Sequence, residues 1–230
     1  MKQIVTESFF FGAVLSLLAY ELGLLLKKKM KMAIVNPILI GILAVMGVLS
    51  LWDIKYETYQ ESAKYISYLL TPATVCLAVP LYEQMKLLKK HWKAVMVGIC
   101  SGVLASLGGV FLLAKAFDLS HELYVTLLPK SITTAIGIGV SEELGGIATI
   151  TVAVIIITGI LGNVIAEAVF RFFHISEPIA KGLAIGTSSH ALGTAKALEL
   201  GQVEGAMSGL AIVVAGLLTV ILAPVFAPLL

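Results

Sequence analysis

Lys130 carries a positive charge in a part of the sequence that is otherwise strongly apolar. It follows Pro129 in a stretch rich in hydroxyl groups, with Ser131, Thr133 and Thr134 directly after it. A charged side chain at the centre of a membrane costs about 2.5 to 3.5 kcal/mol on insertion scales, so it normally has a partner, a water-filled cavity or a ligand. We therefore expect Lys130 to bind an anion, with these hydroxyls as hydrogen-bond donors. The structural alternative is a lysine near a helix end whose ammonium extends to the lipid headgroups.

A second polar cluster lies in the C-terminal part of the chain and contains Ser188, Ser189, His190, Thr194 and Lys196. On a helix His190 and Thr194 share a face, whereas Lys196 lies off it. Hydroxyls and an imidazole suit a carboxylate with an adjacent hydroxyl or keto oxygen, and an imidazole that titrates near neutral pH suits proton coupling. The alternatives are an interhelical hydrogen bond for His190 and a local pair with Glu199 for Lys196.

A third interrupted segment, at residues 71–80, contains Thr71, Thr74 and two prolines. Asn36 precedes a proline in the same way at the start of an earlier apolar segment. Interrupted segments open the backbone at mid-membrane depth, where helix termini and free amides become available to a ligand. We therefore include Thr71 and Thr74 among the candidate binding residues.

The interrupted segments recur at nearly even spacing, beginning at Pro72, Pro129 and Thr187. Each is followed by a charged connector and a long glycine-bearing apolar segment. This pattern predicts an internal repeat in which residues 65–117 and 182–230 run in opposite directions, as in many transporters. Small residues at helix contacts offer an equally good explanation of the recurrence.

Composition places the chain in the membrane class. Hydrophobic residues make up 59% of its 230 residues, charged residues only 13%, and the mean hydropathy is +1.00. A helix needs about 20 apolar residues to cross a bilayer. We predict an all-α, polytopic integral membrane protein with seven to eight hydrophobic segments, some of them broken or re-entrant, forming a single domain over residues 1–230. The net charge of +2 is too small to suggest nucleic-acid binding.

The expected segments follow from the hydropathy and the breaks between them. They are residues 8–26, 33–51, 65–82, 94–117, 123–141, 147–170, 182–198 and 206–230, with a polar loop at 53–64. Lysines at 27–31 and 86–93 indicate cytoplasmic ends, and the basic link at 171–181 indicates a third. Simple alternation through eight crossings does not allow all three, so we expect 123–141 to be re-entrant.

Enzymatic and metal-binding motifs are missing from the sequence. No Cys, His and carboxylate cluster has metal-ligand spacing, and His190 has no neighbouring acid within its span to orient it as a catalytic base. The glycines at 137–146 follow no strand and do not form a phosphate-binding loop. We expect no cofactor and no catalytic activity.

Three long motifs resemble those of the LrgB/CidB family of bacterial membrane proteins. They are residues 127–134, 186–201 and 204–211, and the similarity extends over nearly the whole chain, including Asn36-Pro37, residues 71–82 and residues 142–147. One departure is Ala135, where the family pattern has a proline, so a kink there must come from Pro129 or the glycines. The resemblance implies importance for the matching residues, which include Asn36, Lys130, Ser131, Ser189, His190 and Thr194. It is this implication that adds Asn36 to the candidate binding residues.

The resemblance implies two functions. Bacterial members are described as antiholin-like or holin-like proteins that modulate murein hydrolase activity and lysis with a small LrgA/CidA-type membrane partner. A plant relative with an LrgB-like half is a plastid glycolate/glycerate translocator, and some bacterial pairs are linked to pyruvate. Charged and hydroxyl groups on broken segments favour transport of a small monocarboxylate over oligomeric pore control. We expect a multi-pass, homo-oligomeric protein of the bacterial cytoplasmic membrane.

Overall fold

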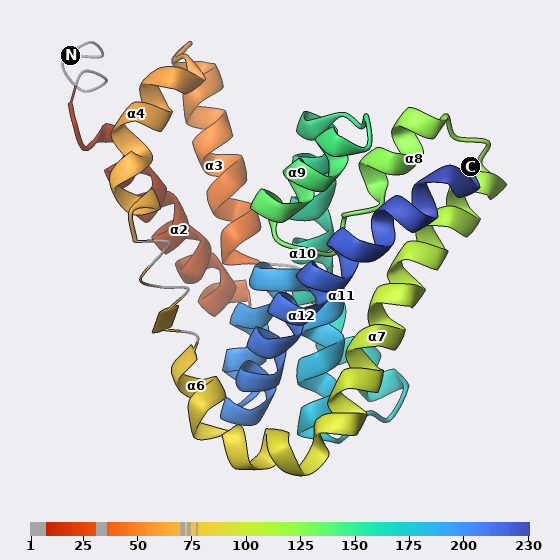
Figure 1. Ribbon diagram of the computed structural model, residues 1–230. Helices are drawn as coiled ribbons and strands as arrows, with labels where there is room; N and C mark the ends of the chain where they lie inside the picture. The colour runs from red at the N-terminus through yellow and green to blue at the C-terminus, as the bar shows by residue number, and fades with distance from the viewer. Residues whose placement is uncertain (1–7, 31–35, 70–71, 73–74, 77) are drawn as a thin grey trace. The chain divides into compact units, whose positions relative to one another are not determined.

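The computed structural model describes residues 8–30, 36–69, 72, 75–76 and 78–230, and every regular element within them is a helix (Figure 1). The predicted all-α class is confirmed. The helices are α2 (Phe11–Met30), α3 (Pro37–Leu51), α4 (Tyr56–Ser67), α6 (Ala78–Glu83), α7 (Met85–Ala116), α8 (His121–Leu127), α9 (Thr134–Glu143), α10 (Ala148–Phe172), α11 (Pro178–Leu200) and α12 (Gln202–Phe226), followed by the 3-10 turn η1 (Ala227–Leu229).

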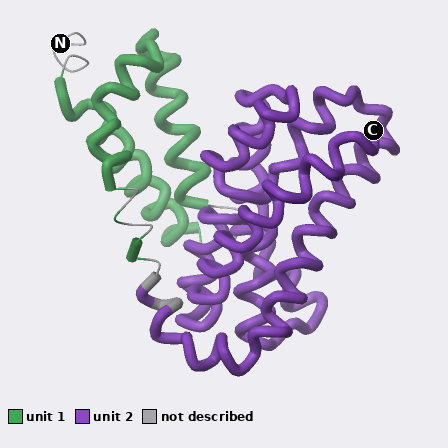
Figure 2. Tube along the Cα trace, in the orientation of Figure 1, with its two compact units in different colours: residues 1–76 green, residues 77–230 purple. Residues whose placement is uncertain are grey.

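The chain divides into two compact units, residues 1–76 and 77–230 (Figure 2). The first contains α2, α3 and α4, and the second contains α6 to α12 with η1. Thr71 and Thr74, two of the predicted binding residues, lie outside the described residues. The evenly spaced repeat and the single domain over 1–230 both stay predictions.

In the first unit, close backbone contacts hold the three helices together. The amide of Gly12 on α2 donates to Ser62 Oγ on α4 at 2.8 Å, and a side chain at Gly12 would collide with the α4 backbone. Asn36 caps α3, because its Oδ1 accepts from the amides of Ile38 and Leu39 at 2.8 and 3.3 Å.

The prediction of a polar loop at 53–64 is wrong, since the helix α4 occupies most of this stretch. Its tyrosines and Ser62 give this polar stretch one face that packs on α2.

Three helices of the described chain are long and apolar enough to cross a membrane: Met85–Ala116, Ala148–Phe172 and Gln202–Leu229. The α3 helix is apolar but shorter, at 15 residues. In α2 the charges of Glu21 and the lysines at 27–29 interrupt the apolar run, and α11 is rich in glycine, serine and threonine. Seven to eight hydrophobic segments therefore remain a prediction, whereas a helical protein with membrane-spanning helices is supported.

The break predicted in residues 123–141 is confirmed. Helix α8 ends at Leu127, residues 128–133 form turns, and α9 begins at Thr134. Pro129 explains the position of the break, because proline lacks the amide that would continue the helix. Ala135, which stands where the family pattern has a proline, lies inside α9 and causes no kink.

Helix α11 is the centre of the second unit and packs against α7, α10 and α12. Glycines on both sides allow the close approach: Gly182 and Gly186 of α11 lie against the α12 backbone, and Gly102 of α7 lies against Thr187. Gly98, one turn before Gly102 on α7, likewise faces α11, where it lies against Leu183. Small residues at a helix contact let two backbones come together without a cavity.

Helix α11 is itself kinked at His190, where φ is 42° and ψ is −138°. A residue with a side chain in this part of backbone space costs about 1 to 3 kcal/mol, so the surrounding contacts must hold it there. The predicted interruption of residues 187–196 is therefore present. Its exact position was not predictable, because His190 is neither proline nor glycine.

Candidate functional site

Lys130 lies in the turn between α8 and α9 with a hydroxyl as its partner. Its Nζ donates to Ser131 Oγ at 2.9 Å, and Ser106 Oγ of α7 donates to the same oxygen at 3.0 Å. Ser131 is buried and Lys130 is half-buried. Among the described residues no carboxylate lies within ion-pairing distance of Lys130. Since an ammonium has three donors, donors remain for another acceptor.

Lys130 lines two cavities of the second unit. The large cavity, about 1080 Å³, lies between α7, α11 and the 128–133 turn. Its wall is mostly apolar and small, and its polar side chains include Ser106, Lys130, Ser131, Thr187 and Ser188. Ligand sites typically combine such an apolar wall with a few polar groups that fix the orientation. The one carboxylate in this lining is Glu177, at the start of α11.

The small cavity, about 450 Å³, is enclosed by α10, α11 and Lys130. Ser188 and Ser189 line it, and Ser188 also lines the large cavity. Ser188 Oγ donates to the Ala184 carbonyl at 2.7 Å and lies 3.0 Å from Ser189 Oγ. A side chain at Gly162 of α10 would collide with Ser189, so this glycine allows the serine pair to sit beside α10.

His190 is buried and forms an interhelical hydrogen bond, one of the two roles considered for it. Its ring nitrogen Nε2 lies 2.9 Å from the Ile155 carbonyl of α10. Because a carbonyl only accepts, Nε2 carries the proton, and Nδ1 is the acceptor in a neutral ring. His190 is not among the residues lining either cavity.

The Thr194 hydroxyl stabilises the kink by contacts with α11 and α12. Its Oγ1 donates to the His190 carbonyl at 3.0 Å and lies 2.7 Å from Ser208 Oγ of α12. Asn163 of α10 donates to the Leu192 carbonyl at 2.9 Å. Contacts from α10 and α12 thus satisfy polar groups around the interruption of α11, which accounts for its persistence.

The structure brings together only part of the predicted set. The cavities around Lys130 are lined by three of them: Lys130, Ser131 and Ser189. The α11 kink contains two more, His190 and Thr194, which are buried and line neither cavity. Thr133 caps α9 without a side-chain hydrogen bond, and neither it nor Thr134 lines either of the two cavities around Lys130. Asn36 belongs to the first unit, where it caps α3.

Ser106 was missed as a binding candidate, although it lines the large cavity. Ser188 belongs to the predicted polar cluster of residues 188–196 and lines the same cavity. Ser106 gave little signal, because it lies in a long uninterrupted apolar helix and contacts Ser131 from a different part of the chain.

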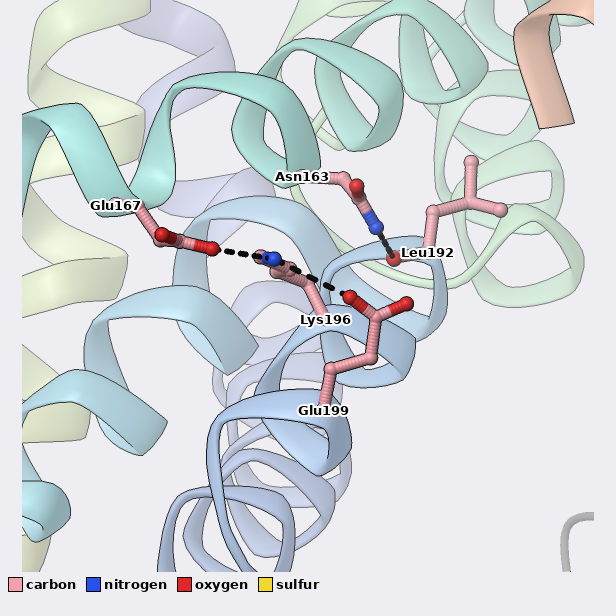
Figure 3. Close-up of polar contacts among 5 residues, drawn as sticks. All are labelled: Asn163, Glu167, Leu192, Lys196 and Glu199. Carbon is pink, nitrogen blue, oxygen red and sulfur yellow. Dashed lines mark hydrogen bonds and ion pairs between the residues drawn. The ribbon is translucent and has the colours of Figure 1, made fainter. Parts of the chain in front are cut away.

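Lys196 differs from Lys130 because two carboxylates pair with it (Figure 3). Its Nζ lies 2.5 Å from Glu167 Oε1 of α10 and 3.2 Å from Glu199 Oε2. The local pair with Glu199 was predicted and is confirmed, whereas the pair with Glu167 was missed. Within the described ranges, no three His, Cys, Asp or Glu side chains lie close enough to share a metal ion.

Comparison with known proteins agrees with the resemblance in the motifs. The LrgB-like family matches residues 16–229. Proteins named antiholin-like protein LrgB from Bacillus cereus and Bacillus anthracis are each 38% identical to this chain over 220 residues, which is 95% of this chain and 96% of theirs. No solved structure matches the chain. With a match over nearly its whole length, this chain belongs to the LrgB-like family.

Proposed function

We propose that this chain has an antiholin-like role in the bacterial cytoplasmic membrane and that its molecular activity is the transport of a small monocarboxylate. The relatives' name supports the first part directly. The second part rests on one observation: Lys130 lines two cavities and, among the described residues, has a hydroxyl but no carboxylate as its partner. An ammonium with remaining donors on a broken helix is suited to an anion.

The chemistry of the lining supports a substrate with one negative charge. Lys130 contributes one positive charge, and Ser106, Ser131 and Ser188 contribute hydroxyls. A carboxylate would pair with the ammonium, and a neighbouring hydroxyl or keto oxygen would bond to a serine. A second carboxylate on the substrate would have no second lysine or arginine in this lining, where Glu177 adds repulsion. Pyruvate, glycolate and glycerate fit this description.

The alternative mechanism is control of lysis by membrane oligomerisation, with an LrgA/CidA-type protein as partner. The relatives' name favours this mechanism more directly than it favours transport. Under the transport mechanism, an effect on lysis would follow from altered carboxylate metabolism. Oligomerisation or an LrgA/CidA-type partner would then help to assemble the transporter. We expect no catalytic activity in either case.

Uptake of labelled pyruvate and glycolate into proteoliposomes distinguishes the two mechanisms. A carrier has a limited number of sites, so uptake should saturate, and Lys130→Gln should reduce it about 100-fold at low substrate concentration. Encapsulated dyes and sugars should stay inside. Release of these unrelated solutes without saturation, and regardless of Lys130, would establish a pore and reject the transport proposal.

A further inference from the structure

A separate cavity lies at the turn that joins α10 to α11. We call it the turn cavity; its volume is about 510 Å³, and it is lined by Glu167, Phe170, Arg171, His174, Ile175, Ser176, Lys181 and Leu200. None of these residues lines the cavities around Lys130 except Phe170, whose side chain is buried between the two regions. The transport site does not account for this cavity.

The polar groups of the turn cavity are mainly basic. Arg171 comes from the end of α10 and Lys181 from the first turns of α11, and neither has a carboxylate partner within the described part of the chain. The one carboxylate in the lining, Glu167, is already paired with Lys196 (Figure 3). One guanidinium and one ammonium group at this concave surface thus have no carboxylate partner among the described residues, which suits a phosphate group.

His174 adds an imidazole to this lining, at a backbone position where helices commonly have glycine. It follows the C-terminus of α10 with φ at 55°, and the Ile175 amide bonds back to the Phe170 carbonyl at 2.8 Å. Helices commonly end with glycine in this left-handed conformation. The same ending occurs at three other helices of the described chain, where the left-handed residue is Asp53, Asp118 or Gly145. Of these four ends, the one beside the turn cavity has an imidazole in this conformation.

The turn lies at a membrane surface, since α10 is one of the helices long enough to span a bilayer and Phe172 is its last residue. Phe172 and Phe173 are 76% and 66% exposed, and their rings pack edge to face at 4.9 Å. Exposed rings at the end of a span suit the boundary between headgroups and acyl chains. The basic residues of the turn favour the cytoplasmic side, where anionic lipids are concentrated.

From these observations we propose that the turn cavity binds the phosphate headgroup of an anionic phospholipid, with Arg171 and Lys181 on the phosphate, His174 at its edge and the Phe172–Phe173 pair against the acyl chains. Phosphatidylglycerol has the required charge. A free phosphate ion has the same chemistry but leaves the exposed aromatic pair without a role, so we assign the site to the lipid.

The test is a titration of the detergent-purified full-length protein with phosphatidylglycerol or phosphatidylcholine, with bound lipid measured by native mass spectrometry. We expect selective binding of phosphatidylglycerol, and binding about 30-fold weaker in the double variant Arg171→Gln/Lys181→Gln. The matched control is Lys89→Gln/Lys90→Gln, which removes the same charge from exposed positions on α7 that line none of the three cavities. It should change binding less than about threefold.

Three results would overturn the proposal. Equal binding of the two lipids would show that the phosphate charge is not recognised. An equal loss in the control variant would show a non-specific surface effect. Displacement of phosphatidylglycerol by excess inorganic phosphate, with phosphate protecting the wild type from thermal unfolding as well as the lipid does, would identify a free-ion site. Because the readout is lipid binding, uptake of carboxylates does not enter the result.

Discussion

Lys130 and Lys196 are two lysines of the same compact unit in opposite surroundings. Lys196 lies 2.5 Å from Glu167 and 3.2 Å from Glu199, so its charge is compensated (Figure 3). Lys130 has a neutral serine as its hydrogen-bond partner and lines two cavities. Lys196 is therefore a structural cation, whereas Lys130 is available to bind an anionic ligand. Both lysines follow a break in a helix.

The largest expected effect is that of Lys130→Gln on carboxylate uptake. Glutamine keeps most of the length and a hydrogen-bond donor but removes the charge that would pair with the substrate. Loss of a charge-assisted bond should reduce uptake at low substrate concentration about 100-fold. Initial rates in proteoliposomes at equal protein content measure this effect.

Lys196→Gln is the matched control for that experiment, since the same substitution is made at a lysine that already has carboxylate partners. Its uptake should stay within about threefold of the wild type. Equal losses in the two variants would contradict the functional distinction between the lysines.

A smaller effect is expected from His190→Gln, because the amide of glutamine can replace Nε2–H as the donor to the Ile155 carbonyl. The variant should fold and transport within about tenfold of the wild type, but its uptake should lose the part of the pH dependence that comes from protonation of His190. The measurement is uptake across a pH series. If the wild type and His190→Gln have the same pH profile, His190 has a structural role only.

Ser106→Ala tests whether α7 contributes to the Lys130 site. Ser106 donates to the same Ser131 oxygen as Lys130 does, so its removal should loosen the position of both groups. We expect KM to rise about three- to tenfold with little change in kcat, as for one neutral hydrogen bond. Ser106→Thr keeps the hydroxyl and should restore KM. An unchanged KM in Ser106→Ala would remove α7 from the site.

The two helix breaks differ in how far the sequence could predict them. The break before α9 was predicted because proline acts locally, and Pro129 marks it in the sequence. The α11 kink was located only to the segment 187–196, because the conformation of His190 depends on contacts with α10 and α12. The predicted loop at 53–64 was wrong for a related reason: α4 is polar overall and owes its helix to one face that packs on α2.

In the candidate site too, the sequence predicted the local features but not the contacts between helices. Lys130 and its neighbouring hydroxyls stand out, since a charge in an apolar stretch is visible without knowledge of the fold. The contact between Ser106 and Ser131 joins residues from different helices, as does the pair of Glu167 and Lys196. Such contacts depend on how the helices pack, and a single sequence contains no direct signal for them.

The smallest expected effect is that of Glu167→Gln, and it concerns stability alone. Glu167 is about half exposed, so solvent weakens its pair with Lys196, and Glu199 remains as a partner. The loss should be about 1 kcal/mol, or a fall of about 2–4 °C in the melting temperature. Thermal unfolding in detergent measures it, and a double-mutant cycle with Lys196→Gln isolates the pair. The coupling should shrink at high salt. Carboxylate uptake should not change, and a large loss of uptake in Glu167→Gln would mean that the Lys196 cluster takes part in transport as Lys130 does.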